Sequence, residues 1–238
     1  NTAMGYNALL SNTTGIGNTS VGFGALDSAT TANYNTTVGQ DSLGAVTSGY
    51  GNTVVGRVAG STITTGFYNT LLGYNAQPSS ATQTNAIVFG ISTYGQGGYT
   101  TTGSGTSDIR AQHGVATWST VSDERYKKDI TDSTAGLAFV NALKPRTWNY
   151  RTLGELPETF SAYEEGSTEV FKNTQTNHGF IAQEVKAAIE ADSGIKDGFK
   201  MWDDRDDGSQ EVAEAALIPV LVKAIQELTA RLAILEDK

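Results

Sequence analysis

Cysteine is absent from the 238 residues, so the chain can form neither disulfides nor thiolate metal sites. Charge is nearly absent from residues 1–107, where Asp27, Asp41 and Arg57 are the only charged side chains. The formal net charge of −9 disfavours a nucleic-acid or anionic-membrane partner, because binding phosphates needs clustered Lys and Arg. No apolar run approaches the roughly 18 residues of a membrane-spanning helix, so we expect no membrane insertion.

The uneven distribution of charge indicates two domains, with a boundary somewhere in 95–121. The first part is rich in Gly, Thr, Asn and Ser, whereas the second has the composition of an ordinary mixed domain. No basic-then-apolar leader is present, and the chain opens at Asn1 in the middle of a repeat. We therefore expect the chain to be a fragment of a longer protein.

The first part repeats with a period of 17 residues. Segments of the form Asn-Thr-x-x-Gly recur at even spacing, and a degenerate copy covers 85–90: Asn1–Gly5, Asn18–Gly22, Asn35–Gly39, Asn52–Gly56 and Asn69–Gly73. A column of small residues keeps the same phase (Ala8, Ala25, Ser42, Ala59, Ala76), and a column of leucines ends after its third copy (Leu9, Leu26, Leu43). A fixed period of this size predicts stacked coils.

Helix is disfavoured in these coils by their composition, and the short Thr/Val pieces that end in Gly are typical of strands closed by turns. We expect the asparagines to stack at the turns, each bonding the next coil. The small-residue column suggests close approach to a neighbouring chain. One apolar column is expected to point inward: Met4, Val21, Val38, Val55 and Leu72.

Residues 1–90 resemble the head repeats of trimeric autotransporter adhesins and similar phage-fibre repeats. That resemblance implies a trimeric all-β fibre, a β-roll or β-helix. Whether it is a plain spacer or a host-binding surface stays open. The Gly/Ser/Thr-rich residues 91–121 are interpreted as a connector, with Tyr94 and Tyr99 as alternative receptor contacts.

Four blocks follow one another in the second part: SDERYKKDI (122–130), ALKPRTWNYR (142–151), HGFIAQEV (178–185) and ALIPVLVKAIQEL (216–228). In this order they resemble the intramolecular chaperone domain of phage endosialidases and other tail proteins, which is also classed as an S74 peptidase. The resemblance covers about 108–238. It implies an α+β domain, here 122–238, that trimerises, templates folding of the preceding fibre and then cuts itself off.

The resemblance also implies the site. The cut falls at Val121–Ser122, Ser122 and Lys127 form the catalytic pair, and Asp123 and Arg125 are supporting residues of the motif. It further implies a homotrimer in a virion tail, assembled in the host cytoplasm and able to contact a host receptor or glycan through the fibre. No cofactor and no metal are expected, and nothing indicates turnover of external substrates.

The chemistry of a Ser-Lys pair is coherent. A serine hydroxyl needs a base, and a free lysine, with a pKa of about 10.4, becomes one only when burial or neighbouring cations lower that pKa. Lys128 is the competing base. In a helix, five residues turn through roughly 140°, and in a strand they span about 16 Å, so either a bend joins the pair or another subunit completes it. Alternatively, Ser122 simply caps a helix.

The rest of the domain is expected to contain a helix at 134–143, a strand at 146–151, and a strand followed by a helix at 178–191. The acidic run 203–208 lacks the glutamate of a calcium loop, so we interpret it as a hairpin turn. His178 and Glu184 are interpreted as structural residues.

The C-terminal segment 217–237 carries three heptads, which predict a coiled-coil helix. The a positions are Ile218, Ile225 and Leu232, and the d positions are Leu221, Leu228 and Leu235. Ile at a with Leu at d favours a parallel dimer, so the trimer follows from the resemblance alone. The alternative is an amphipathic helix packed on its own domain.

Other functions stay open. The C-terminal domain could trimerise a host-binding fibre without cutting it, or the chain could be a bacterial trimeric adhesin. A carbohydrate-cleaving site would need paired carboxylates, and Asp27 and Asp41 do not share a repeat phase within one chain.

Overall fold

The computed structural model describes residues 1–192, 194–195 and 199–236. The chain divides into two compact units, Asn1–Lys128 and Asp129–Lys238. The first is a β-solenoid of 17-residue coils, and the second is a mixed α/β unit that ends in a long helix. The predicted order of folds is confirmed.

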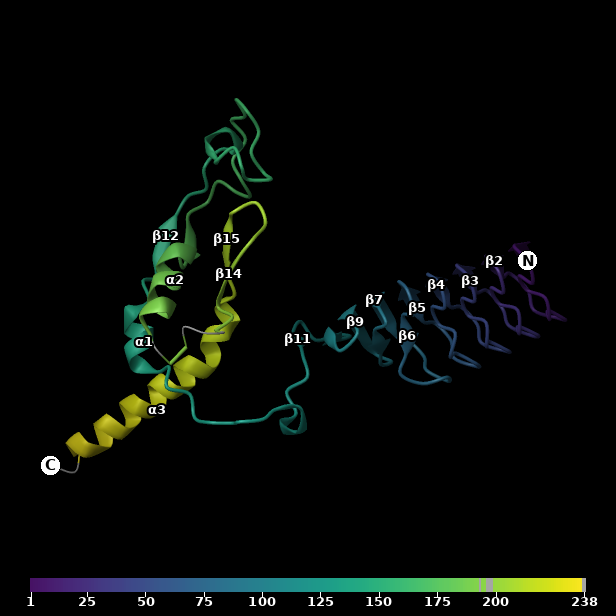
Figure 1. Ribbon diagram of the computed structural model, residues 1–238, viewed down its shortest axis with the longest axis horizontal. Helices are drawn as coiled ribbons and strands as arrows, with labels where there is room; N and C mark the ends of the chain where they lie inside the picture. The colour runs from purple at the N-terminus through teal and green to yellow at the C-terminus, as the bar shows by residue number, and fades with distance from the viewer. Residues whose placement is uncertain (193, 196–198, 237–238) are drawn as a thin grey trace. The chain divides into compact units, whose positions relative to one another are not determined.

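Each coil of the solenoid contributes one short strand to a parallel sheet (Figure 1). Strands pair in register at the repeat spacing, so Thr2 faces Thr19 and Thr19 faces Thr36. The pairs continue without a slip to Leu72 opposite Phe89. The strands are β1 (Thr2–Met4), β2 (Thr19–Val21), β3 (Thr36–Val38), β4 (Thr53–Val55), β5 (Thr70–Leu72) and β7 (Ile87–Ile91).

The apolar column that was predicted to face inward faces outward instead. Met4 is 66% exposed and Leu72 is 50% exposed, with Val38 and Val55 between them also exposed. The residue before each of these points into the coil, because successive side chains of a strand alternate between the two faces. The inward column is mixed in polarity, and its fully covered members are Ser20, Thr37, Val54, Leu71 and Val88.

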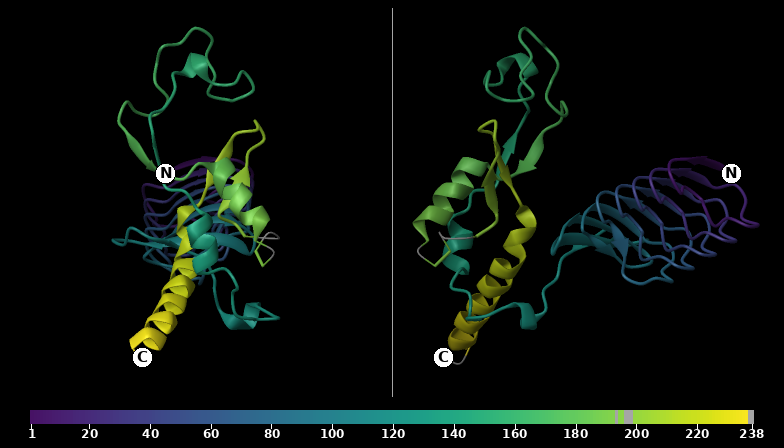
Figure 2. Two further views of the ribbon diagram at one scale, coloured as in Figure 1. Left: turned by 90° about the vertical axis from the view of Figure 1, so that its left-hand side faces the viewer. Right: turned by 45° about the vertical axis from the view of Figure 1, so that its right-hand side comes forward.

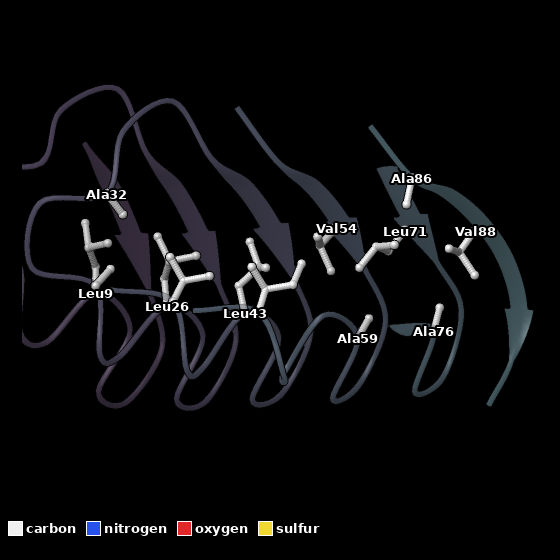
Figure 3. Close-up of a cluster of buried hydrophobic side chains, with 13 residues drawn as sticks. Leu9, Leu26, Ala32, Leu43, Val54, Ala59, Leu71, Ala76, Ala86 and Val88 are labelled. Atoms are coloured by element: carbon white, nitrogen blue, oxygen red, sulfur yellow. The ribbon is translucent and has the colours of Figure 1, made fainter. Parts of the chain in front are cut away.

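The size of the side chain in the inward column changes along the stack, and it is larger where the leucine column has ended. Leu9, Leu26 and Leu43 follow one another along the stack, and the inward strand positions of the early coils are the small Ser20 and Thr37 (Figure 3). Where the leucine column ends at Gly60, Leu43 and Leu71 occupy the space, since a Cβ on Gly60 would lie 2.9 Å from Leu43 Cδ2 and 3.1 Å from Leu71 Cδ1. Each coil therefore keeps a filled interior.

The predicted asparagine ladder is present and buried. Asn52 Nδ2 donates to Asn35 Oδ1 at 2.9 Å, and Asn69 Nδ2 donates to Asn52 Oδ1 at 3.0 Å. The column of small residues is also buried within the chain, since Ala25, Ser42, Ala59 and Ala76 are 0% exposed. The expectation that this column meets a neighbouring chain is wrong: a small side chain is needed there because the coil is thin.

In every second coil, a tyrosine ring covers a glycine of the preceding coil. The ring of Tyr34 lies over Gly17, where an added Cβ would lie 2.5 Å from ring atom Cδ1. Tyr68 covers Gly51 in the same way, at 2.7 Å. Both tyrosines adopt a left-handed backbone conformation, with φ of 54° and 57°.

Strands also occupy the segment that was interpreted as a connector. They are β8 (Tyr94–Gly95), which pairs with β6 (Gln77–Pro78), then β9 (Tyr99–Ser104), β10 (Ser107–Gln112) and β11 (Trp118–Ser119). β9 continues the parallel sheet beside β7, and β10 and β11 add antiparallel strands. This cap, residues 94–121, closes one end of the sheet. The two-residue loop Gly105–Thr106 joins β9 and β10, and a glycine in so short a loop is typical of a hairpin.

The second unit packs helices around a small core (Figure 2). Its helices are α1 (Leu137–Ala142), α2 (Ala182–Ala191) and α3 (Leu217–Glu236), and its hairpins are β12 (Arg146–Trp148) with β13 (Asn177–Gly179) and β14 (Trp202–Asp204) with β15 (Gln210–Val212). Short 3-10 turns lie at Leu153–Glu155 and Glu214–Ala216. The core includes Phe139, Val185, Ile189, Met201 and Val220. None of the described helices combines the length and apolar character of a membrane span.

Candidate functional site

Ser122 and Lys127 lie in direct contact. Lys127 Nζ donates to Ser122 Oγ at 2.7 Å, and both residues belong to the unit Asn1–Lys128 of one chain. The sequence left open whether a bend or another subunit brings them together. In this structure a bend joins them.

The bend is a 3-10 turn, η1 (Glu124–Tyr126), followed by an extended residue. Lys127 N donates to Glu124 O at 2.8 Å, and Lys127 itself has φ −116° and ψ 149°. A tight turn reverses the chain, and the extended residue after it directs its side chain back along the turn. The turn therefore lets the side chains of Ser122 and Lys127 meet although they are five residues apart. Neither a continuous helix nor a continuous strand would bring them together.

Asp123 caps this turn, and the alternative in which Ser122 is the cap is wrong. Asp123 Oδ1 accepts from the backbone N of Arg125 at 2.9 Å and from Arg125 Nε at 2.9 Å. Arg125 Nη2 completes the ion pair with Asp123 Oδ2 at 2.5 Å. Because Asp123 performs the capping, the hydroxyl of Ser122 remains available to Lys127.

The Asp123–Arg125 pair also fixes the charges around the turn. The hydrogen bonds from the Arg125 side chain and backbone hold the pKa of Asp123 below its ordinary value, and the charge of Lys127 acts in the same direction. The pKa of Arg125 is raised by the hydrogen bond to Asp123. Asp123 is consequently a carboxylate at neutral pH, and its role here is to hold the turn.

The other candidate bases do not contact Ser122 within the described residues. His113 Nε2 lies 3.3 Å from the hydroxyl of Thr100, on the solenoid cap. Lys128 has no hydrogen bond to Ser122 among the bonds of the described residues. Lys127, the residue that the resemblance implies, is thus the lysine that contacts Ser122 in the described residues.

Ser122 and Lys127 are both exposed in the single chain. As an ammonium, Lys127 donates its hydrogen bond to Oγ, whereas a general base must accept the Oγ proton as a neutral amine. A change that buries the pair would favour the neutral amine, because desolvation disfavours charge.

The chain just before Ser122 is held to the solenoid, and the sequence interpretation missed this. Ser119 Oγ donates to Arg110 O at 3.2 Å, and Thr120 Oγ1 donates to Asp108 O at 3.2 Å. The available signal was the glycine of the short Gly105–Thr106 loop between two strand-forming segments, which is typical of a hairpin.

In the second unit, the remaining candidates have structural partners. His178 pairs across the β12–β13 hairpin with Thr147, and Glu184 forms a two-pronged ion pair with Arg146, with Oε1 2.6 Å from Nη2. That hydrogen bond lowers the pKa of Glu184. The acidic run 203–208 ends strand β14 and forms most of the turn of the β14–β15 hairpin, so the predicted hairpin is present. Within the described residues, no cluster of potential metal ligands occurs.

The predicted coiled-coil positions lie on the exposed side of α3. Helix α3 covers 217–236, and residue 237 of the predicted segment lies outside the described residues. A different stripe of the helix, which includes Leu217, Val220 and Ala224, packs on the unit. The exposed fractions of the six seam side chains range from 42% to 66%: Ile218, Leu221, Ile225, Leu228, Leu232 and Leu235.

Comparison with known protein families gives a match to the second part of the chain. The family model described as chaperone of endosialidase, Peptidase_S74, matches residues 122–193. No curated protein and no solved structure matches the chain. The matched segment begins at Ser122, includes the η1 turn and Lys127, and continues through α1, both strands of the β12–β13 hairpin and α2. Residues 122–193 are therefore similar to the chaperone of endosialidase family, and they follow a β-solenoid of 17-residue repeats.

Proposed function

We propose that this chain cuts itself once, between Val121 and Ser122, with Ser122 as nucleophile and Lys127 as general base. The observation that carries the proposal is the 2.7 Å contact between Lys127 Nζ and Ser122 Oγ. The family match supports it, because that match begins at Ser122 and its family is a self-cleaving peptidase family. The chain would be a single-turnover peptidase.

The reaction follows from the position of the nucleophile beside the bond it cuts. Neutral Lys127 takes the Oγ proton as Oγ adds to the carbonyl carbon of Val121, which closes a five-membered ring through Cβ, Cα and N of Ser122. The C–N bond then breaks, the amine takes a proton from Lys127, and an ester joins Val121 to Oγ. Water hydrolyses the ester, which leaves a carboxylate on Val121 and the free hydroxyl and amine of Ser122.

We also propose that the functional form is a homotrimer in which the C-terminal domain templates the fibre. Two apolar surfaces of the single chain support association. One is the exposed seam of α3, and the other is the outward column of the solenoid strands, in which Met4, Val38, Val55 and Leu72 are exposed. Exposed apolar surfaces of this extent are typical of association sites.

Association would bury the dyad and so link cutting to assembly, since burial favours neutral Lys127. This is consistent with a fibre-associated chaperone that is removed after use. We infer a location in a virion tail, with assembly in the host cytoplasm and the solenoid as the part that remains. Contact of the solenoid with a host receptor or glycan is a further part of this proposal.

The experiment is denaturing mass spectrometry of the freshly expressed chain beside three variants. We expect the wild type to give fragments 1–121 and 122–238, Ser122→Ala and Lys127→Ala to remain intact, and Lys128→Ala to be cut like the wild type. Hydroxylamine added during cutting should trap the ester as a hydroxamate on Val121.

An intact wild-type chain under conditions where it trimerises would reject self-cleavage. The domain would then be a non-cleaving trimerisation domain on a fibre or on a bacterial trimeric adhesin. Cutting of Lys127→Ala at the wild-type rate, with loss of cutting in Lys128→Ala, would instead assign the base to Lys128.

A further inference from the structure

The residues directly before the proposed cut form the last strand of the solenoid sheet. β11 pairs antiparallel with β10, so that Trp118 faces Ala111 and Ser119 faces Arg110. The bond between Val121 and Ser122 lies two residues beyond the end of this strand. The acyl side of the bond is thus attached to the solenoid, and the serine side belongs to the η1 turn.

We propose that β10 positions the scissile bond, so that cutting depends on completion of the solenoid cap. Ser119 and Thr120 are positioning residues in this proposal, because they hold the chain before Val121 through side-chain bonds to β10. The inference rests on the proposed self-cleavage and adds a regulatory requirement to it.

The order of strands in the sheet explains why cutting would depend on the solenoid. The sheet ends in the order β7-β9-β10-β11, in which each strand lies beside the previous one. β9 pairs in parallel with β7 over Ile87–Ile91, and β10 pairs along the whole of β9. The place of β11 in the solenoid sheet is therefore set through β10 and β9 by the last coil.

Two side-chain bonds fix the chain beyond the short β10–β11 ladder. The hydroxyl of Ser119 reaches the carbonyl of Arg110, and the hydroxyl of Thr120 reaches that of Asp108, which keeps the chain extended along β10. Thr120, Asp108 and Ile109 also line an open hollow at this edge. An extended, immobilised acyl segment limits the positions of the Val121 carbonyl, and restricting a reacting group in this way accelerates an intramolecular attack.

Protease substrates commonly bind as an added strand on a sheet edge, where main-chain bonds provide the affinity. Here the fibre supplies that edge to its own chain. In an incomplete solenoid, Ser122 and Lys127 could still meet through the η1 turn, but the Val121 carbonyl would be free to leave the reactive position. The proposed peptidase would therefore cut finished fibres faster than unfinished ones.

The test compares first-order cutting rates of full-length chains, refolded under one condition and analysed by denaturing mass spectrometry. Ser119→Ala with Thr120→Val removes both hydroxyl bonds and should slow cutting roughly tenfold, because two modest hydrogen bonds are lost. Ser119→Pro, which is incompatible with the strand ladder, should slow it further. Ser119→Thr with Thr120→Ser keeps both hydroxyls and should restore the wild-type rate.

The matched control is Ser104→Ala with Thr100→Ser, which changes hydroxyl residues on β9, the strand on the other side of β10 from β11. It should cut at the wild-type rate. Far-UV circular dichroism must show the solenoid folded in every variant. Wild-type rates for both Ser119→Pro and the double variant would overturn the positioning role while leaving self-cleavage intact. An uncut wild type would instead overturn the proposed function itself.

Discussion

The buried asparagines show how single residues stabilise the stack. Asn52 is 0% exposed and donates through Nδ2 to Asn35 Oδ1 and to Gly66 O, at 2.9 and 3.0 Å. Its own Oδ1 accepts from the backbone and side chain of Asn69, both at 3.0 Å. One side chain thereby satisfies polar groups of both adjacent coils, which a thin coil cannot expose to water.

Asn52→Ala should destabilise the solenoid by about 2–4 kcal/mol, because it leaves the Asn69 backbone amide and the Gly66 carbonyl buried without these partners. Urea unfolding followed by circular dichroism measures the change. Thr65→Ala in the same coil removes an exposed hydroxyl and is the control. Equal midpoints for the two variants would show that the ladder contributes little.

At the residue scale, the sequence predicted which residues recur in each coil better than it predicted whether their side chains point inward or outward. The period and the asparagine bonds are confirmed, but the column containing Met4 and Leu72 was assigned to the wrong face. In a strand, a shift by one residue moves every side chain to the other face. The inward column includes the polar residues Ser20 and Thr37. A prediction based on hydrophobicity therefore assigned the neighbouring column, which contains Met4 and Leu72, to the interior. The contact between Ser122 and Lys127 depended on a turn capped by Asp123, which spacing alone could not reveal.

At the scale of elements, helix α3 has two apolar stripes with different uses. The buried stripe contains Leu217, Val220 and Ala224, and the exposed seam contains Leu221 and Leu228. The C-terminal part of α3 extends beyond α1 and α2 (Figure 2). The heptads predicted the seam but not the second stripe, because an apolar 3.5-residue pattern does not say which neighbours it contacts.

Leu228→Asp should disrupt the proposed trimer while the second unit stays folded, since this side chain is 49% exposed in the single chain. Light scattering coupled to size exclusion measures the mass. Gln226→Asp adds the same charge off the seam and should leave the mass unchanged. A trimer of normal stability in Leu228→Asp would exclude α3 as the association seam.

The β14–β15 hairpin is attached to a loop by a carboxylate, which makes the second unit sensitive to acid. Asp207 accepts from the backbone of Ser161 at 3.0 Å and from the hydroxyl of Ser209 at 2.6 Å. These bonds, with the Ser161 backbone contributing most, hold the pKa of Asp207 well below its ordinary value of 3.8. The ion pair with Arg146 lowers the pKa of Glu184 similarly.

Both pKa values are lower in the folded state, so the unfolded state binds more protons as the pH falls. The stabilisation is complete above about pH 5 and is lost progressively below about pH 4. We expect Trp148 and Trp202 fluorescence to report unfolding there, in a Ser122→Ala, Trp118→Phe background. Asp207→Asn should weaken the pH dependence. If the pH dependence of unfolding were unchanged in Asp207→Asn, Asp207 would be excluded as a cause of the acid sensitivity.

On the scale of the whole molecule, the chain joins a repetitive unit to a non-repetitive one. Stacked coils interact with their neighbours alone, so in the proposed trimer the repeating backbone pairing does not specify which coil of one chain lies beside which coil of another. The cap, residues 94–121, and the C-terminal domain are the non-repetitive parts that would set this register. The sequence predicted both units from composition, but it missed the cap because Gly, Ser and Thr also dominate flexible connectors.

The tyrosines over glycines have a consequence for how such a fibre can grow or shrink. Backbone pairing repeats every 17 residues, but the order Gly17, Tyr34, Gly51, Tyr68 repeats every second coil. Deleting 35–51 would place Tyr34 under the ring of Tyr68, in the space that only a glycine leaves free. Deleting 18–51 would restore the alternation, so its thermal midpoint should exceed that of the shorter deletion. The heritable module of this fibre is then a doublet of coils, and lineages should gain or lose coils in pairs.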